Sequence, residues 1–311
     1  MHQAGSLPKS VRITDITGRD GFQNLKAWIP TDVKKEVLSK LASSGVRSME
    51  ITSFVSPKAI PQLADAGEIA SFMREKHPEV NAICLVPNRK GAERAAECGI
   101  KSIAYVISVS EAHNKANVNH GHDESLADLA GIAAAFPDLR ITLSVSTVFG
   151  CPFTGAVPIE KVVWLVKEGL ARGASLVTLC DTIGVANPLQ IRAALGKIRE
   201  MFPATDMGVH LHDTHGMGLA NTMAALEAGI DRFETSGGGL GGCPFAPGAA
   251  GNTATEDSLN MFHRMGINTG VDLSRYLDGV AFMRESIAMP LSGHLSSART
   301  YAEFCFYPPS A

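Results

Sequence analysis

The segment from residue 176 to residue 212 reads LVTLCDTIGVANPLQIRAALGKIREMFPATDMGVHLH, and it decides the fold. A short apolar run, Leu176–Cys180, leads through an amphipathic stretch near 188–201 into a second apolar run, Met207–Leu211. This alternation is typical of a βαβ unit with two parallel strands. Strands of a parallel sheet are buried on both faces, which explains why both runs are almost continuously apolar.

The same alternation extends in both directions along the chain. The predicted strands are Val11–Thr17, Val46–Thr52, Ala82–Val86, Ser102–Val109, Ile141–Thr147, Leu176–Cys180, Met207–Leu211 and Arg232–Ser236. The predicted helices lie near 31–44, 59–76, 89–98, 124–136, 158–172, 188–201, 217–229 and 255–265. Eight even units favour a closed (β/α)₈ TIM barrel over a doubly wound open sheet. An additional C-terminal helical segment, Leu273–Ser286, is expected to pack outside the barrel.

Length and composition predict one domain. No Pro- or Ser-rich linker divides the 311 residues, so we expect a flexible N-terminus at 1–10, a barrel at 11–290 and a C-terminal tail at 291–311. Apolar residues make up 45% and charged residues 19%, as in an ordinary globular protein. The net charge of −3, without blocks of like charge, argues against nucleic-acid and membrane-surface partners.

The cysteines and the N-terminus predict a cytoplasmic protein. None of the six cysteines forms a C-x-x-C pair, so neither a structural zinc site nor a disulfide framework is indicated. The first ten residues lack the patterns of a signal or transit peptide. No apolar run approaches the roughly 18 residues that a membrane span requires.

His210 and His212 are the first candidates for chemistry. Residues i and i+2 of a strand point to the same face, so both imidazoles converge if the strand continues through them. With an aspartate and an amide oxygen they would form a mixed N/O site that accepts Mg²⁺, Mn²⁺, Co²⁺ or Zn²⁺. The competing interpretation is a pair of hydrogen-bonded core histidines. Asp213 and His215 lie beyond the strand and are expected to orient a ligand histidine.

Charged residues also stand at the ends of three other predicted strands. Arg19 and Asp20 are adjacent, and we expect their side chains to point in different directions, one toward a metal and the other toward a developing negative charge. The competing interpretation is a surface ion pair. Glu50 would be costly to bury unpaired and is expected to pair with a cation or to hydrogen-bond within the site. Asp181 fits either the site or an N-cap of the next turn.

The glycine-rich stretch 237–242 precedes Cys243. It lacks the Gly-Lys-Ser/Thr ending of a phosphate-binding loop and is more typical of a lid. A thiol on a lid above a metal centre could donate a proton or respond to oxidation.

Together these residues resemble the HMG-CoA lyase family of TIM-barrel metallolyases, from about residue 11 to residue 285. The most specific match is the segment Gly238–Asp257. Six further motifs match in the same order: Arg19–Asn24, Glu50–Lys58, Val86–Asn88, Gly150–Phe153, Asp181–Gly184 and His210–Thr214. The resemblance implies an acyl-CoA substrate, a homodimer and a role in leucine catabolism.

The resemblance also implies a set of site residues. The metal ligands would be Asp20, His210, His212 and Asn252, with Mg²⁺ or Mn²⁺ expected before Co²⁺ or Zn²⁺. Catalytic roles fall to Arg19, Glu50, Asp181, His210 and Cys243, and substrate contacts to Arg19, Ser53 and Thr178. The implied reaction is a retro-Claisen cleavage of 3-hydroxy-3-methylglutaryl-CoA to acetyl-CoA and acetoacetate. His210 or Asp181 would remove the hydroxyl proton, Arg19 would stabilise the enolate, and Cys243 could protonate it through water.

Five departures from the family pattern affect the substrate more than the reaction. The chain has Gly18, Leu25, Cys180 and His113 where the family commonly has Pro, Glu, Gly and an aromatic residue, and Thr178 where it has Ser. A related thioester such as citramalyl-CoA therefore stays open, as does a CoA-free hydroxy-keto-acid aldolase. A condensing synthase is disfavoured because only a short stretch follows the eighth unit. A non-catalytic binding protein is disfavoured by the intact ligand set.

Overall fold

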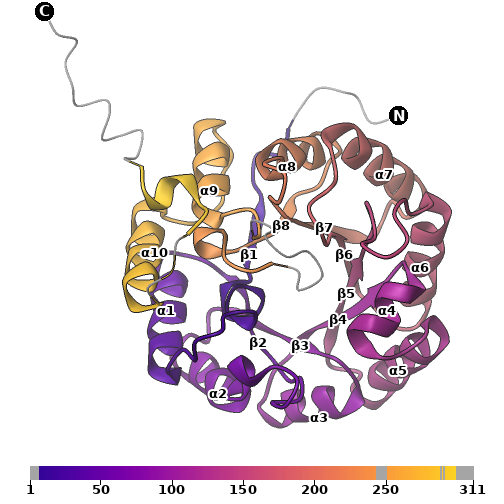
Figure 1. Cartoon of the computed structure of the whole chain (residues 1–311), viewed down its shortest axis with the longest axis horizontal. Coiled ribbons are helices and arrows are strands. Elements are labelled where there is room, and N and C mark those ends of the chain that lie inside the picture. Colours follow the sequence, from indigo (N-terminus) through magenta and orange to yellow (C-terminus); the bar gives the residue numbers. More distant parts are fainter. Residues whose placement is uncertain (1–6, 243–250, 288, 290, 299–311) are drawn as a thin grey trace, which may run out of the picture.

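Eight parallel strands close into a barrel at the centre of the protein (Figure 1). The structure is a computed structural model that describes residues 7–242, 251–287, 289 and 291–298. The strands are β1 (Arg12–Asp15), β2 (Ser48–Ser53), β3 (Asn81–Val86), β4 (Ser102–Ser108), β5 (Arg140–Ser146), β6 (Leu176–Asp181), β7 (Asp206–Leu211) and β8 (Arg232–Thr235). Because β1 pairs with both β2 and β8, the sheet has no edge. The predicted barrel is confirmed, and the open sheet is excluded.

Helices surround the barrel on its outside (Figure 1). They are α1 (Thr31–Ser43), α2 (Ala66–Lys76), α3 (Arg89–Glu97), α4 (Glu111–Val118), α5 (His122–Ala135), α6 (Ile159–Ala171), α7 (Pro188–Met201), α8 (Gly218–Glu227), α9 (Thr255–Arg264) and α10 (Leu273–Ile287). The helix α10 is the predicted additional segment, and it packs against α1 and α9. None of the described helices is long and apolar enough to cross a lipid bilayer.

Two helix predictions need correction. The helix predicted near 59–76 begins only at Ala66, after a separate 3₁₀ turn at Pro61–Leu63. Proline disfavours the helical conformation for the residue before it, and Ile60 is accordingly extended, with φ −132° and ψ 85°. The helix α4 was not predicted. It begins where the Ser110 side chain accepts a hydrogen bond from the backbone N–H of His113.

Short irregular segments at the carboxyl ends of β1 and β8 complete the face that carries the polar residues. A π-helical turn, Thr17–Gly21, follows β1, and a 3₁₀ turn, Gly237–Gly239, follows β8. The described part of the C-terminal region packs on this side as well, because the backbone N–H of Ser292 donates to the Gly238 carbonyl. The Asp257 carboxylate of α9 likewise accepts from the backbone N–H of His294, at 2.7 Å.

Candidate active site

A cavity of about 580 Å³ lies at the carboxyl-terminal ends of the strands. Its lining includes Arg19, Asp20, His210 and His212. TIM barrels carry their active sites on this face, and ligand pockets of small molecules have volumes of this order. The cavity therefore brings ionisable residues from the turn after β1 and from the end of β7 to one ligand-sized space.

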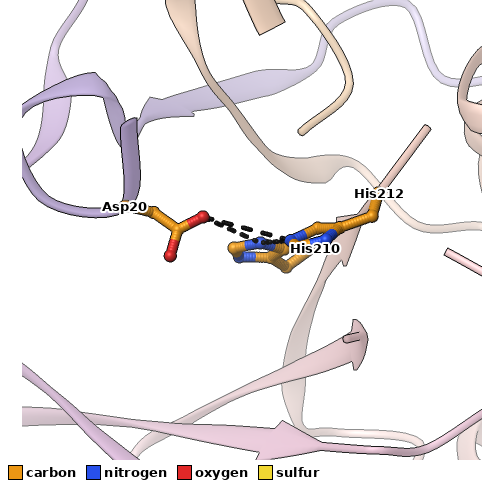
Figure 2. A group of neighbouring side chains, drawn as sticks. All are labelled: Asp20, His210 and His212. Atoms are coloured by element: carbon orange, nitrogen blue, oxygen red, sulfur yellow. Dashed lines mark hydrogen bonds and ion pairs between the residues drawn. The ribbon is translucent and has the colours of Figure 1, made fainter. Parts of the chain in front are cut away.

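Two histidines and an aspartate form a compact group inside this cavity (Figure 2). His210 belongs to β7, and His212 directly follows that strand. Their Nε2 atoms are 3.1 Å apart, and each lies 4.0 Å from Oδ2 of Asp20. All three side chains are buried, and their potential ligand atoms lie within 4.8 Å of one another. Imidazole nitrogens and a carboxylate oxygen at these separations can converge on one divalent cation.

Asn252 extends this group to four potential ligands. Its Nδ2 donates to Oδ2 of Asp20 and to the Leu240 carbonyl, both at 2.7 Å. Its Oδ1 is buried and accepts no hydrogen bond from any described residue. An orphaned buried oxygen beside a carboxylate and two imidazoles is what a cation-binding site requires. The residues present thus fit a divalent cation better than they fit a pair of ordinary core histidines.

A glycine allows the backbone to come this close. Gly241 has φ +99°, in the left-handed region, and a Cβ on it would lie 2.4 Å from Nδ2 of Asn252. The same Cβ would lie 2.8 Å from Oδ2 of Asp20. Any side chain at position 241 would therefore displace two of the four candidate ligands.

Arg19 lies beside the metal-binding group and is held between two carboxylates. Its Nε donates to Oε2 of Glu50 at 2.7 Å, and its Nη1 donates to Oδ1 of Asp20 at 2.5 Å. The prediction that Glu50 pairs with a cation is confirmed. The prediction that Arg19 and Asp20 point in different directions is wrong, because the π-helical turn brings both into contact. Asp20 thereby faces the arginine with one oxygen and the histidines with the other.

Burial and neighbouring charges set the protonation of this cluster. Burial would raise the pKa of Asp20, but Arg19, His210 and His212 outweigh it and lower that pKa to about 2. Burial lowers the pKa of His212 to about 4, so its imidazole is neutral at pH 7, as a metal ligand must be. Burial raises the pKa of Glu50 to about 7 although Arg19 acts in the opposite direction.

Glu234 is a site residue that the sequence analysis missed. It lies on β8 opposite His210, and its Oε2 is 3.1 Å from Nδ1 of that histidine. Its Oε1 accepts a hydrogen bond of 2.8 Å from the Thr178 hydroxyl. The orienting role expected of Asp213 or His215 is therefore filled by Glu234. The signal was available, because Glu234 interrupts a buried strand just as Glu50 does.

The remaining predicted residues lie outside this cluster or outside the described part of the chain. Both oxygens of Asp181 accept backbone hydrogen bonds, from Val185 and Ala186, so its carboxylate caps the turn after β6. The Ser53 hydroxyl donates to the Leu85 carbonyl at 3.1 Å. Neither Ser53, Thr178 nor Asp181 is among the residues that line the cavity. Cys243 lies outside the described residues.

Two of the residues that depart from the family pattern do line the cavity. His113 and Cys180 form part of its wall, whereas Leu25 does not. Gly18 packs tightly against β2, since a Cβ there would lie 2.6 Å from the Ile51 carbonyl oxygen.

Comparison with known proteins gives one consistent family. The model of the HMGL-like family matches residues 10–281. A hydroxymethylglutaryl-CoA lyase of Bacillus subtilis is 42% identical over 286 residues, covering 91% of this chain and 95% of that protein. The mitochondrial hydroxymethylglutaryl-CoA lyase of Bos taurus is 40% identical, covering 91% of this chain and 87% of that protein.

The fold agrees with the sequence comparison. An HMG-CoA lyase from Acenitobacter baumannii, solved in complex with coenzyme A and 3-methylmalate, superposes with a TM-score of 0.92. The two chains are 35% identical, and the match covers 98% of this chain and 100% of that one.

Proposed function

The chain belongs to the HMGL-like family, and from that premise we propose that it is a divalent-cation-dependent carbon–carbon lyase that cleaves HMG-CoA to acetyl-CoA and acetoacetate. The observation that carries the proposal is the buried group of Asp20, His210 and His212 inside a ligand-sized cavity, with Arg19 beside it. The relatives that are named hydroxymethylglutaryl-CoA lyases support the same reaction.

Asp20, His210, His212 and Asn252 would hold the cation, for which Mg²⁺ or Mn²⁺ is the proposed identity. When bound, the cation supplies Lewis-acid chemistry that lowers the pKa of the substrate's tertiary hydroxyl. Glu234 fixes the ring of His210 through Nδ1, so that Nε2 faces the Asp20 side of the cavity.

His210 is the proposed acceptor of the hydroxyl proton through Nε2, since Nδ1 lies against Glu234. Nε2 can take the proton only while it is not bound to the cation, which Asp20, His212 and Asn252 would then hold. Of the two candidates, His210 lines the cavity, whereas both oxygens of Asp181 are occupied by the backbone N–H groups of Val185 and Ala186. A general base must reach the proton it removes, so cavity access favours His210. Asp181 then acts on the reaction by holding the turn after β6.

Loss of that proton allows the bond between C2 and C3 of the acyl chain to break. The electron pair of this bond moves onto C2 and is delocalised into the thioester carbonyl, giving the enolate of acetyl-CoA, while C3 becomes the ketone of acetoacetate. Arg19 is the buried cation suited to stabilise the enolate oxygen, and Glu50 keeps its guanidinium in place. Cys243 is the proposed proton donor to C2. Ser53 and Thr178 do not line the cavity, so we propose that they support the substrate site from behind its wall, Ser53 through the Leu85 carbonyl and Thr178 through Glu234.

A second substrate stays open because of the cavity wall. His113 and Cys180 replace residues common in the family and line the cavity, so they can change which substituent is accepted at C3. Citramalyl-CoA is the alternative thioester, and a CoA-free hydroxy-keto acid is the alternative outside the thioesters.

A homodimer and a cytoplasmic location are kept as proposals. The location is supported by Cys84, Cys98, Cys151 and Cys180, which form no disulfide.

Acetyl-CoA release from purified protein tests the proposal. HMG-CoA and citramalyl-CoA are offered separately with Mg²⁺ or Mn²⁺, with and without EDTA, to wild type and to His212→Ala. His263→Ala, a histidine exposed on α9, is the matched control. We expect EDTA and His212→Ala to abolish release and His263→Ala to leave it within about two-fold of wild type. Cleavage of citramalyl-CoA alone would reassign the substrate, and cleavage of neither thioester by metal-loaded protein would refute the assignment.

A further inference from the structure

A second cavity, of about 540 Å³, lies at the opposite end of the barrel. Its lining comes from the first residues of the strands, among them Arg12 of β1, Ser48 of β2, Arg140 of β5 and Arg232 of β8. The amino-terminal face of a TIM barrel ordinarily serves stability and carries no catalytic groups. A ligand-sized cavity on this face is therefore not explained by the lyase reaction.

The charge of this cavity is strongly one-sided. Four arginines line it, namely Arg12, Arg47, Arg140 and Arg232, together with a single carboxylate, Asp206. The whole chain has a net charge of −3, so this concentration of positive charge is local. A concave site lined by one sign of charge focuses the electrostatic potential and attracts ions of the opposite sign.

Two of the four guanidinium groups are already paired. Arg12 donates to both oxygens of Asp206, at 2.9 and 2.8 Å, and to Asp231 at 2.7 Å. Arg232 lies 3.8 Å from the same Asp206. Such an ion-pair network is expected on the amino-terminal face of a TIM barrel, where residues ordinarily serve stability. These contacts fix one wall of the cavity.

The other two guanidinium groups are not paired in this way. Within the described part of the chain, neither Arg47 nor Arg140 forms an ion pair within 4.0 Å or a side-chain hydrogen bond. Both residues are exposed, and they enter from different segments, Arg47 just before β2 and Arg140 at the start of β5. Their donors are available to a ligand in the cavity.

Polar groups of the barrel interior complete the site. Thr14 donates to the Ser48 hydroxyl at 3.2 Å, and Ser102 donates to Oδ1 of Asn81 at 2.7 Å. Thr142 lines the same space. Since Thr14 and Ser102 already donate their hydroxyl protons, the groups that can donate to an oxyanion are the Ser48 and Thr142 hydroxyls and the Asn81 amide NH₂.

We propose that this cavity, defined by Arg47, Arg140 and the hydroxyl-bearing residues between them, binds a small multivalent oxyanion. Guanidinium groups recognise phosphate and carboxylate alike through paired N–H donors, so the shared chemistry is a compact anion with several such oxygens. The volume suits a small organic anion as well as a free inorganic one. The site is separate from the lyase centre, and its occupation is independent of Arg19 and the histidine pair.

Isothermal titration calorimetry with two probes tests this site and distinguishes a phosphorylated ligand from a polycarboxylate. Inorganic phosphate represents phosphorylated ligands, and tricarballylate represents polycarboxylates, each titrated at constant ionic strength into the full-length protein. The test variant is the double substitution Arg47→Gln/Arg140→Gln. The control is Lys197→Gln/Arg275→Gln, which removes the same charge from exposed positions on α7 and α10.

We expect at least one probe to bind wild type, and the tighter of the two to identify the class of ligand. The Arg47/Arg140 variant should lose at least ten-fold in affinity, and the Lys197/Arg275 variant should stay within about two-fold of wild type. Lyase activity of both variants should be unchanged, which keeps this test independent of the proposed reaction. Absence of binding to wild type, an equal loss in both variants, or undiminished binding to the Arg47/Arg140 variant would each overturn the proposal.

Discussion

Replacement of Glu234 by glutamine isolates the contribution of the residue that orients His210. The substitution keeps the size and one acceptor oxygen of the side chain but removes its charge. The contact to Nδ1 of His210 is 3.1 Å long, and both side chains are at most 12% exposed. A charge-assisted hydrogen bond is worth about 1.5–3 kcal/mol and a neutral one about half as much, so we expect a loss of about 0.8–1.5 kcal/mol.

That free energy should appear as weaker metal binding. At about 1.4 kcal/mol per factor of ten, the affinity for Mn²⁺ should fall about 3- to 12-fold in Glu234→Gln. The Mn²⁺ affinity of Glu234→Ala should fall further, because Nδ1 of His210 would be left buried and unpaired.

Calorimetric titration of metal-free protein with Mn²⁺ measures this effect, with acetyl-CoA release at saturating Mn²⁺ as a second readout. Glu227→Gln is the control, because Glu227 is an exposed residue of α8 that forms an ion pair with Arg192 of α7. Thr178→Val removes the other hydrogen bond of Glu234 and should have a smaller effect than Glu234→Ala. An affinity of Glu234→Gln within two-fold of wild type would show that Glu234 does not tune the site.

Three further predictions concern the lyase site and its surroundings. Gly241→Ala should weaken Mn²⁺ binding at least ten-fold, because φ is +99° and the new Cβ would displace Asn252 and Asp20. Titration with Mn²⁺ measures the affinity, and an affinity equal to that of wild type would contradict the proposed ligand set. Arg19→Lys should lower kcat about 10²–10³-fold with a smaller change in KM, as for loss of one transition-state donor; steady-state kinetics on HMG-CoA measure both, and a change confined to KM would count against enolate stabilisation. Burial raises the pKa of Glu256 from 4.5 to about 8, so the folded state keeps a proton that the unfolded chain releases, and stability should fall as pH rises from about 4.5 to about 8. Glu256→Gln should therefore gain thermal stability relative to wild type as pH rises through this window; a constant difference in Tm would contradict the buried neutral acid.

Much of the barrel follows from local sequence patterns. A buried parallel strand must be apolar on both faces, so runs such as Leu176–Cys180 and Met207–Leu211 stand out from the amphipathic helix between them. Each predicted strand overlaps an observed one. The exceptions occur where backbone chemistry dominates, as at Pro61, or where an extra helix follows a strand, as α4 does.

The site was less predictable because it depends on contacts between distant strands. Position within β7 indicated that His210 and His212 share a face, and the structure brings them together. The register of β7 and β8, which pairs His210 with Glu234, cannot be obtained from either strand alone. An ion pair between Arg19 and Asp20 was considered only as a surface contact, and its burial depends on a π-helical turn that no sequence pattern indicated.

The candidate cation ligands come from the two ends of the barrel's strand order. Asp20 follows the first strand, His210 lies on the seventh, His212 directly follows the seventh, and Asn252 follows the eighth. Asn252 and Asp20 are 232 positions apart and in direct contact. A chain that ends before Asn252 lacks the last partner, however well its first six units have folded. During synthesis the ligand set is therefore completed only after almost the whole barrel has been made. Once the ligand set is complete, a bound cation would link the segments that follow β1 and β8. The pairing of these two strands closes the barrel and joins its most distant segments, so it carries the largest loop-closure entropy. Lyase activity would then be a measure of complete barrel closure.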